Sequence, residues 1–109
     1  MNRNFSQTIS FRCDDPAPVL EMLAEWDLGQ ATSDIMGYMG VRLLSDRERQ
    51  GHYMAVVDFG VVDPDVPAAD EGARNNLRPE TRAFVERMLE VIDGEPEYHD
   101  FDEIFRTDR

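Results

Sequence analysis

Two apolar segments on either side of a charged turn constrain the fold of this chain more than any other feature. They span residues 38–44 and 53–59, and both are rich in Val, Leu, Met and aromatic side chains, which favour β-strands. The turn between them, residues 45–51, ends in glycine and has a length that hairpins tolerate. The sequence therefore predicts a central antiparallel hairpin over residues 37–60.

A strand and a helix are predicted before this hairpin. Apolar and polar residues alternate over 5–13, with Gln7 as the polar exception on the apolar side. A helix is expected from Pro16, capped by Asp15, to Gly29. A second helix is expected over 79–93. The apolar faces are Val19, Leu20, Leu23 and Trp26 in the first helix, and Phe84, Val85, Met88, Leu89 and Ile92 in the second.

The chain is expected to end in a strand over 96–106 and a loose tail over 106–109. Apolar residues in that strand change parity, which predicts a bulge near 100–102. Prolines and acidic residues over 63–76 favour a loop with one short helical turn at 68–73. The order strand, helix, strand, strand, helix, strand is the ferredoxin-like arrangement of an α+β protein, with two helices on one face of a four-stranded antiparallel sheet.

Both faces of the hairpin strands are largely apolar. In the first strand we assign Met39, Val41 and Leu43 to one face, and Tyr38, Gly40, Arg42 and Leu44 to the other. In the second, Tyr53, Ala55, Val57 and Phe59 oppose His52, Met54, Val56 and Asp58. Strands covered on both sides have this composition. The helices would cover one side, so we expect a second copy of the chain to cover the other, giving a homodimer.

Length and charge exclude several classes of protein. With 109 residues, the chain suits a single domain over 1–109. Its formal net charge of −12 argues against nucleic acid and anionic membrane surfaces as partners. The sequence has neither the ~20-residue apolar segment of a membrane span nor an apolar signal core at its start. One cysteine, Cys13, makes no internal disulfide, which favours the cytoplasm.

The hairpin resembles a known family. Its strands read Gly-Tyr-Met-Gly-Val-Arg-Leu-Leu at 37–44 and His-Tyr-Met-Ala-Val-Val-Asp-Phe at 52–59, which is similar to antibiotic-biosynthesis-monooxygenase-type (ABM) domains of the dimeric α+β barrel superfamily. Length, element order and the loop before the second helix agree. The resemblance implies a protomer whose sheet packs against its twin to form a barrel, with a small pocket between sheet and helices. Family members include cofactor-free oxygenases for aromatic polyketides, haem-degrading enzymes and domains of unknown activity.

The sequence departs from the haem-degrading relatives. Those carry an Asn on the first strand, a Trp near the pocket and an iron-ligating His. Here the first-strand polar residue is Gln7, the single Trp26 lies on the first helix, and neither histidine falls on the second helix. We therefore reject haem degradation and transfer no catalytic residue from the family.

Candidate ligand-binding residues come from the apolar faces. Gln7 carries a donor and an acceptor that must find partners if buried, either in a ligand or in the backbone and buried water. A pocket for an aromatic molecule, or plain core packing, would account for the aromatic and Met side chains Trp26, Tyr38, Tyr53, Phe84 and Met88. His52 and Tyr53, beside the turn, join Gln7 as candidates for orienting a substrate.

The remaining polar candidates have structural explanations. Asp58 lies in an apolar strand and could pair with Arg42 on its neighbour, in a pocket or at an interface. His99 with Asp100 and Asp102 could hold a metal only with a bulge, because neighbouring strand residues face opposite ways. No metal-binding pair of the His-x-His or Cys-x-x-Cys type is present. We expect no metal and no cofactor, and a packing role for Cys13.

Two functions follow. In the first, a dimer binds a small apolar or aromatic molecule and acts as a monooxygenase without metal or flavin, so that the electron-rich substrate itself activates oxygen. In the second, the same fold serves as a non-catalytic binding or interaction module. The sequence does not decide whether the protein is an enzyme.

Overall fold

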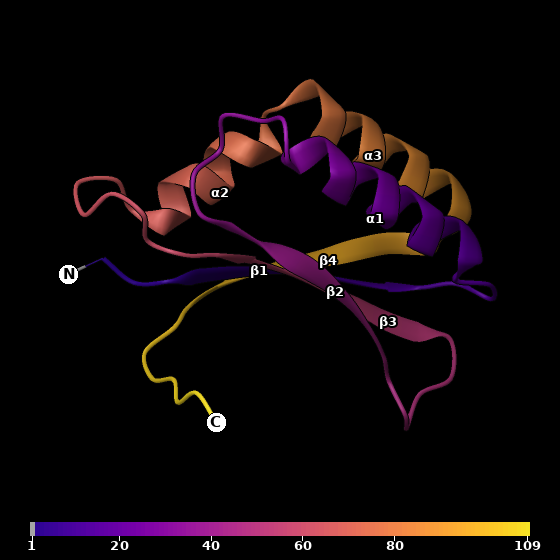
Figure 1. The fold of residues 1–109 in the computed structure, drawn as a ribbon. Coiled ribbons are helices and arrows are strands. Elements are labelled where there is room, and N and C mark those ends of the chain that lie inside the picture. Colours follow the sequence, from indigo (N-terminus) through magenta and orange to yellow (C-terminus); the bar gives the residue numbers. More distant parts are fainter. Residues whose placement is uncertain (1) are drawn as a thin grey trace.

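The computed structural model describes residues 2–109 and has two layers, a four-stranded sheet and three helices on one of its faces (Figure 1). The strands are β1 (Phe5–Arg12), β2 (Tyr38–Ser45), β3 (His52–Phe59) and β4 (Asp93–Asp102), and the helices are α1 (Ala17–Gln30), α2 (Ala68–Asn76) and α3 (Pro79–Val91). The predicted ferredoxin-like fold is confirmed, with α2 as an additional helix.

All strand pairs are antiparallel, and the order across the sheet is β2-β3-β1-β4. Residues that pair across strands share a face of the sheet. One row consists of Val57, Gln7 and Asp100, and the next consists of Ala55, Ile9 and Tyr98. Both rows face the helices. Rows of the other parity, among them Asp58, Ser6 and Phe101, lie on the open face.

A bulge in β2 corrects the predicted face of Tyr38. The pairing with β3 shifts between Tyr38 and Gly40, and Gly40 has φ 120°, a conformation that favours glycine. The shift turns Tyr38 to the helix side, where its ring packs at 5.5 Å from Trp26. Tyr38 therefore shares its face with Val41 and Leu43, and not with Arg42.

The register also corrects two expectations about polar and bulged positions. Asp58 lies opposite Gly40 and Ser6, and it accepts a hydrogen bond from the Ser6 hydroxyl at 2.5 Å. Arg42 lies opposite Val56, so the expected Asp58–Arg42 pair does not form. In β4 the irregularity lies between the partners of Ser10 and Arg12, which are Glu97 and Asp93. The bulge is therefore near 93–97, at Gly94 and Pro96, and not near 100–102.

The segment predicted as a loop with one turn forms the helix α2. Its acidic residues Asp70 and Glu71 lie in the first turn and Arg74 in the last, where each sign of charge complements the helix dipole. Helix α1 begins at Ala17, whose N–H donates to Asp15 Oδ1 at 3.0 Å. Leu20, expected on the apolar face of α1, is 51% exposed, whereas Met22 is buried instead.

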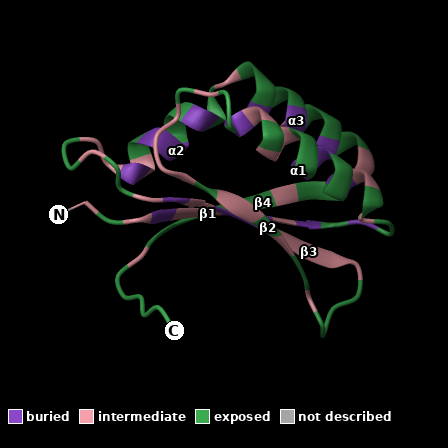
Figure 2. Ribbon diagram, in the orientation of Figure 1, coloured by how far each residue is buried: buried purple, intermediate pink, exposed green. Residues whose placement is uncertain are grey.

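The core consists of two clusters of buried side chains. We call the first the Phe59 cluster, which comprises Phe5, Val57, Phe59 and Ala68 under α2. We call the second the Met88 cluster, which comprises Ile9, Phe11, Cys13, Val19, Met22, Leu23, Ala55, Phe84, Met88 and Ile92 under α1 and α3. Trp26 and Val41 pack against both. Figure 2 shows that buried residues gather in β1, β3 and the helices, whereas β4 and the C-terminal segment stay largely exposed.

Within residues 2–109, no helix combines the length and the apolarity that crossing a membrane requires.

Candidate functional site

A cavity of about 320 Å³ lies where the two clusters meet, between the sheet and the helices. Its floor is the pair of helix-facing rows in the sheet, which supply Gln7, Ile9, Ala55, Val57 and Tyr98. Its walls and mouth come from the helices, which supply Leu23, Trp26, Asn75, Asn76, Thr81, Arg82, Phe84, Val85 and Glu86. Because β4 is an exposed edge strand, Tyr98 stands at the opening.

The walls of the cavity are mainly apolar and aromatic. Trp26 packs against Phe84 at 6.1 Å and is fixed by a hydrogen bond from its Nε1 to Thr81 Oγ1 at 3.0 Å. Thr81 is only 7% exposed. An indole held by packing on one side and by a hydrogen bond on the other presents a rigid aromatic surface, which suits a flat ligand.

The floor carries two polar side chains. Gln7 Nε2 donates to Asp100 Oδ1 at 3.2 Å across the β1–β4 pair, which leaves its Oε1 as an acceptor. Burial raises the pKa of Tyr98, and nearby Glu95 adds to this effect, so its phenol stays protonated at neutral pH. The floor can thus accept one hydrogen bond and donate another.

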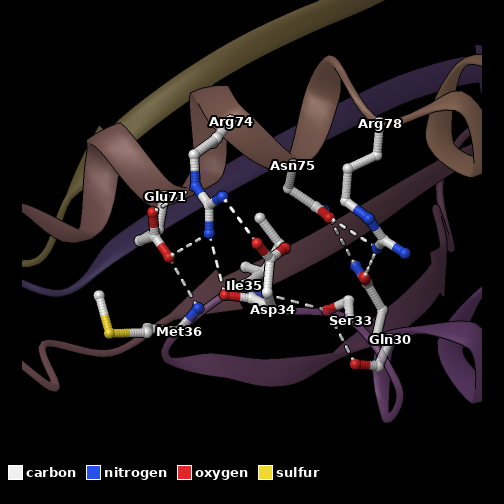
Figure 3. Close-up of polar contacts among 9 residues, drawn as sticks. All are labelled: Gln30, Ser33, Asp34, Ile35, Met36, Glu71, Arg74, Asn75 and Arg78. Carbon is white, nitrogen blue, oxygen red and sulfur yellow. Dashed lines mark hydrogen bonds and ion pairs between the residues drawn. The ribbon is translucent and has the colours of Figure 1, made fainter.

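A buried polar cluster fixes the helix side of the cavity (Figure 3). Gln30, at the end of α1, donates from Nε2 to Asn75 Oδ1 at 3.1 Å. Arg78 Nη1 donates to the same Oδ1 at 3.2 Å, and also to Gln30 Oε1. Asn75 is 1% exposed. These three residues join the ends of α1 and α2 to the start of α3.

A second polar cluster holds the loop between α1 and β2 against α2 (Figure 3). Glu71 accepts from the Met36 N–H at 2.8 Å and from Arg74 Nε at 2.9 Å. Arg74 also donates to the carboxylate and the backbone carbonyl of Asp34, at 3.2 and 2.9 Å. The hydrogen bond from Arg74 lowers the pKa of Glu71 although burial opposes it. Both carboxylates therefore remain charged at neutral pH and keep the loop in place.

The structure separates the residues predicted for a pocket into two groups. Gln7, Trp26 and Phe84 line the cavity together. Tyr38 lies behind Trp26 and donates its hydroxyl to Asp27, and Met88 is 1% exposed within the core.

Tyr53 and His52 lie elsewhere. They line a different hollow of about 310 Å³ at the turn of the hairpin, with Phe11 stacked on Tyr53 at 5.8 Å. Their distance along β3 from Val57 explains this, because a strand advances about 3.3 Å per residue.

The acidic end of the chain shows no metal-binding arrangement. Within residues 2–109, no three His, Cys, Asp or Glu side chains gather as metal ligands would. His99 and Asp100 face opposite sides of β4, and His99 lies 3.8 Å from Glu97. Burial and the neighbouring carboxylates, Asp93 first among them, raise the pKa of the Cys13 thiol, which disfavours its reactive thiolate form, and the side chain packs in the Met88 cluster.

Asn75, Thr81 and Tyr98 line the cavity but were not predicted from the sequence. Asn75 lies in the segment interpreted as a loop, and Thr81 lies between the predicted apolar positions of the second helix. The alternation in β4 could have placed Tyr98 on the helix face, had the bulge been assigned to 93–97 and not to 100–102.

Solved structures share this fold. A scan against protein-family models finds no match, and a search of curated proteins finds none. A variant of SnoaB from Streptomyces nogalater, a cofactor-independent oxygenase, is 16% identical over 95% of this chain and 96% of its own, with a TM-score of 0.72.

Two provisionally named antibiotic biosynthesis monooxygenases match similarly. That from Bordetella bronchiseptica is 16% identical over 95% of this chain and 100% of its own, with a TM-score of 0.72. That from Nitrosomonas europaea is 6% identical over 99% and 97%, with a TM-score of 0.69. The protein therefore has the ferredoxin-like fold of ABM-type proteins, as the hairpin resemblance implied.

Proposed function

We propose that this protein binds a small, largely apolar molecule, aromatic or quinone-like, in the cavity between sheet and helices, and oxygenates it without metal or flavin. The observation that carries the proposal is the cavity itself, with about 320 Å³ of space beside the rigid indole of Trp26 and few polar groups. Cavities of this size and composition are typical of sites for small ligands. The shared fold with a cofactor-independent oxygenase supports the catalytic part.

The chemistry would belong mainly to the substrate. A methylene between two aromatic rings that are conjugated with a carbonyl loses a proton readily to solvent, and the resulting carbanion can pass an electron to O₂. The carbon radical and superoxide combine to a peroxide anion, which takes a proton back from solvent, and the hydroperoxide then loses water to leave a ketone. In this reaction Gln7 Oε1 accepts from a ligand hydroxyl, the protonated Tyr98 donates to a ligand oxygen, and the apolar walls exclude water.

A non-catalytic binding module is the second candidate. Glu86 is the single carboxylate among the described residues that line the cavity, and it is exposed at the mouth. A buried general base is the usual means of removing a carbon-bound proton. The lack of a buried carboxylate among the described lining residues therefore favours binding of a ligand without turnover.

The protein would function as a homodimer through the open face of the sheet. Leu44, Met54 and Phe101 supply apolar area on that face, where Leu44 is 40% exposed and Phe101 54%. Hydroxyl groups of β1 separate them, which suits a tightly packed polar and apolar interface. Light scattering at micromolar concentration should give twice 12.5 kDa, and a mass near 12.5 kDa would contradict the dimer.

The decisive experiment uses anthrone, a planar ketone with one activated methylene. The purified protein, treated with a chelator, is incubated with anthrone under ¹⁸O₂, and anthraquinone is followed by mass spectrometry. We expect formation well above the protein-free rate, with one labelled oxygen in the product. Gln7→Ala should slow it about tenfold, the value of one lost hydrogen bond.

The matched control is Gln50→Ala, the same truncation at an exposed turn residue, which should leave the rate unchanged. Binding of anthrone without turnover would favour the binding module. An absence of both binding and turnover for anthrone and related aromatic ketones would remove the proposal.

A further inference from the structure

The amide of Asn75 has a fixed orientation. An arginine side chain has donors but no acceptor, so Arg78 can contact only the oxygen ends of the two amides beside it. It donates to Asn75 Oδ1 at 3.2 Å and to Gln30 Oε1. The oxygen of Gln30 is thereby committed to Arg78, and its nitrogen becomes the second donor to Asn75 Oδ1, at 3.1 Å.

The side-chain amide nitrogen of Asn75, Nδ2, has no hydrogen-bond partner among the described residues. Within residues 2–109, the hydrogen bonds of the Asn75 side chain both end on Oδ1. The residue is 1% exposed and lines the cavity, and no fully buried side-chain N or O atom in the described part of the chain lacks a partner. Nδ2 therefore keeps a small accessible surface, and because Asn75 lines the cavity we infer that its hydrogens point into it.

We propose that Asn75 is the residue that determines ligand specificity, so that the cavity selects apolar molecules bearing a neutral carbonyl or ether oxygen directed at α2. This inference rests on the proposed binding function and narrows the class of ligand. A ligand that fills the cavity removes water from this donor, and a donor then left without a partner costs free energy, so a ligand oxygen at this position is favoured over a C–H group. Arg78 is a positioning residue, because it acts on the ligand only through Asn75.

Thr81 adds a second donor on the same side. Its Oγ1 accepts from Trp26 Nε1 at 3.0 Å, so the hydroxyl hydrogen is free to point elsewhere. It is 7% exposed and also lines the cavity. The helix side of the cavity thus donates, whereas Gln7 Oε1 on the floor accepts. A ligand with a carbonyl at one end and a hydroxyl at the other would satisfy both sides.

The test compares two molecules of nearly equal size, 1-tetralone, which has a carbonyl, and tetralin, which lacks it. Dissociation constants are measured by isothermal titration calorimetry, and quenching of Trp26, the single tryptophan, shows that binding occurs beside its indole. We compare the dissociation constant of tetralin with that of 1-tetralone as a ratio, which is large when the carbonyl improves binding. A general loss of stability or affinity affects both constants and cancels from this ratio.

The key variant is Asn75→Asp. It keeps an oxygen for Gln30 and Arg78 and replaces the donor that faces the cavity by an acceptor. We expect the ratio to fall at least tenfold, the equivalent of about 1.4 kcal/mol. Arg78→Met frees the amide to turn and should lower the ratio about threefold. Ala73→Asp, which adds the same charge at an exposed position of α2, should leave it unchanged.

The possible outcomes separate the role of Asn75 from the proposed binding function. A ratio that stays within twofold of the original in Asn75→Asp overturns the role of Asn75, while binding of both molecules leaves the proposed binding function standing. An equal fall in Ala73→Asp assigns the effect to charge alone and also overturns it. If the unaltered protein binds neither molecule, the proposed binding function fails and this inference fails with it.

Discussion

The Phe59 cluster and the cavity lie side by side on the helix face of the same sheet, yet one is filled and the other is not. In the cluster, Phe59 is 1% exposed, with its ring 6.2 Å from that of Phe5 and 6.1 Å from that of Tyr38. Helix α2 approaches so closely that a Cβ on Gly72 would lie 2.6 Å from the Phe5 ring. The cavity, by contrast, retains about 320 Å³.

Side chains account for part of the difference. Next to the cavity, β3 carries Ala55 where the cluster has Phe59, and both lie on the helix face of the strand. The residues beside the cavity on the helices include Asn75 and Thr81, whose polar groups are held by specific hydrogen bonds. Small and polar residues keep this space open, whereas aromatic residues close the neighbouring one.

Truncating a phenylalanine in each region should give the largest effect. Phe59→Ala removes a ring that has packing partners on every side, so we expect a loss of about 3–5 kcal/mol in the free energy of unfolding. Phe84→Ala should cost at least about 1 kcal/mol less, because one side of its ring already faces open space. Urea denaturation measures both. Equal losses would mean that the cavity is as well packed as the cluster.

Adding atoms should destabilise the Phe59 cluster, which is full, more than the region of the cavity, which has space. Gly72→Ala places a Cβ against the stiff ring of Phe5, and overpacking costs about 1–3 kcal/mol. The better helix propensity of alanine, about 1 kcal/mol, offsets part of that cost, so a net destabilisation of about 1 kcal/mol is expected.

Ala55→Leu, by contrast, directs its extra carbons into the cavity. We expect the free energy of unfolding to change by less than about 0.5 kcal/mol, and the affinity for 1-tetralone to fall more than tenfold. Urea denaturation and calorimetry test the two halves of this expectation. If Ala55→Leu destabilises the protein as much as Gly72→Ala does, the space is closed in solution.

The same two regions show how far the sequence predicts the structure. Period-two alternation placed Phe59, Gln7 and Ala55 correctly, because strand geometry alone determines which residues share a face. Tyr38 was assigned to the wrong face because a single bulge at Gly40 reverses parity. Such a bulge depends on how β2 pairs with β3, and the sequence of β2 alone does not show that pairing.

The helix side of the cavity was harder to predict. Residues 68–76 contain small and charged side chains between prolines and turns, and their helix is stabilised by distant partners such as the Met36 N–H and the Asp34 carbonyl. Asn75 acquires its role from Gln30 and Arg78, which belong to other segments. Local propensity carries no information about such contacts, so the sequence identified the aromatic wall and missed the polar one.

The contacts that Glu71 makes with Met36 and Arg74 offer a smaller test. Glu71→Gln keeps an acceptor for the Met36 N–H and removes the charge that pairs with Arg74. We expect a loss of about 1 kcal/mol at pH 7, the usual value for a hydrogen bond of this kind.

This loss should depend on pH. Because the pKa of Glu71 is lowered in the folded state, the stabilisation is fully present above the unfolded pKa of about 4.3 and disappears as pH falls through the folded value. The difference between the two proteins in urea denaturation should therefore be constant from pH 7 to pH 5 and shrink below pH 4. A difference that persists unchanged at pH 3 would contradict the ion pair.

Tyrosine ionisation gives the smallest effect and compares the regions most directly. Burial raises the pKa of both Tyr38, behind Trp26, and Tyr98, at the mouth of the cavity, and the hydrogen bond to Asp27 raises that of Tyr38 further. Both phenols should be less ionised at pH 10 than a free tyrosine, which is half ionised there. A ligand in the cavity removes more water from Tyr98 and should raise its pKa again, whereas Tyr38 has no contact with the cavity space.

The measurement is the absorbance of tyrosinate at 295 nm between pH 9 and pH 12, with and without tetralin, in Tyr38→Phe and Tyr98→Phe, each combined with Tyr53→Phe so that a single tyrosine remains. In Tyr38→Phe, where Tyr98 remains, tetralin should move the titration to higher pH. In Tyr98→Phe, where Tyr38 remains, the curve should not move, because the closed region has no space that a ligand can enter. A shift in both variants would mean that tetralin loosens or coats the whole molecule. The distinction between a filled region around Phe59 and an open cavity beside Tyr98 would then be wrong.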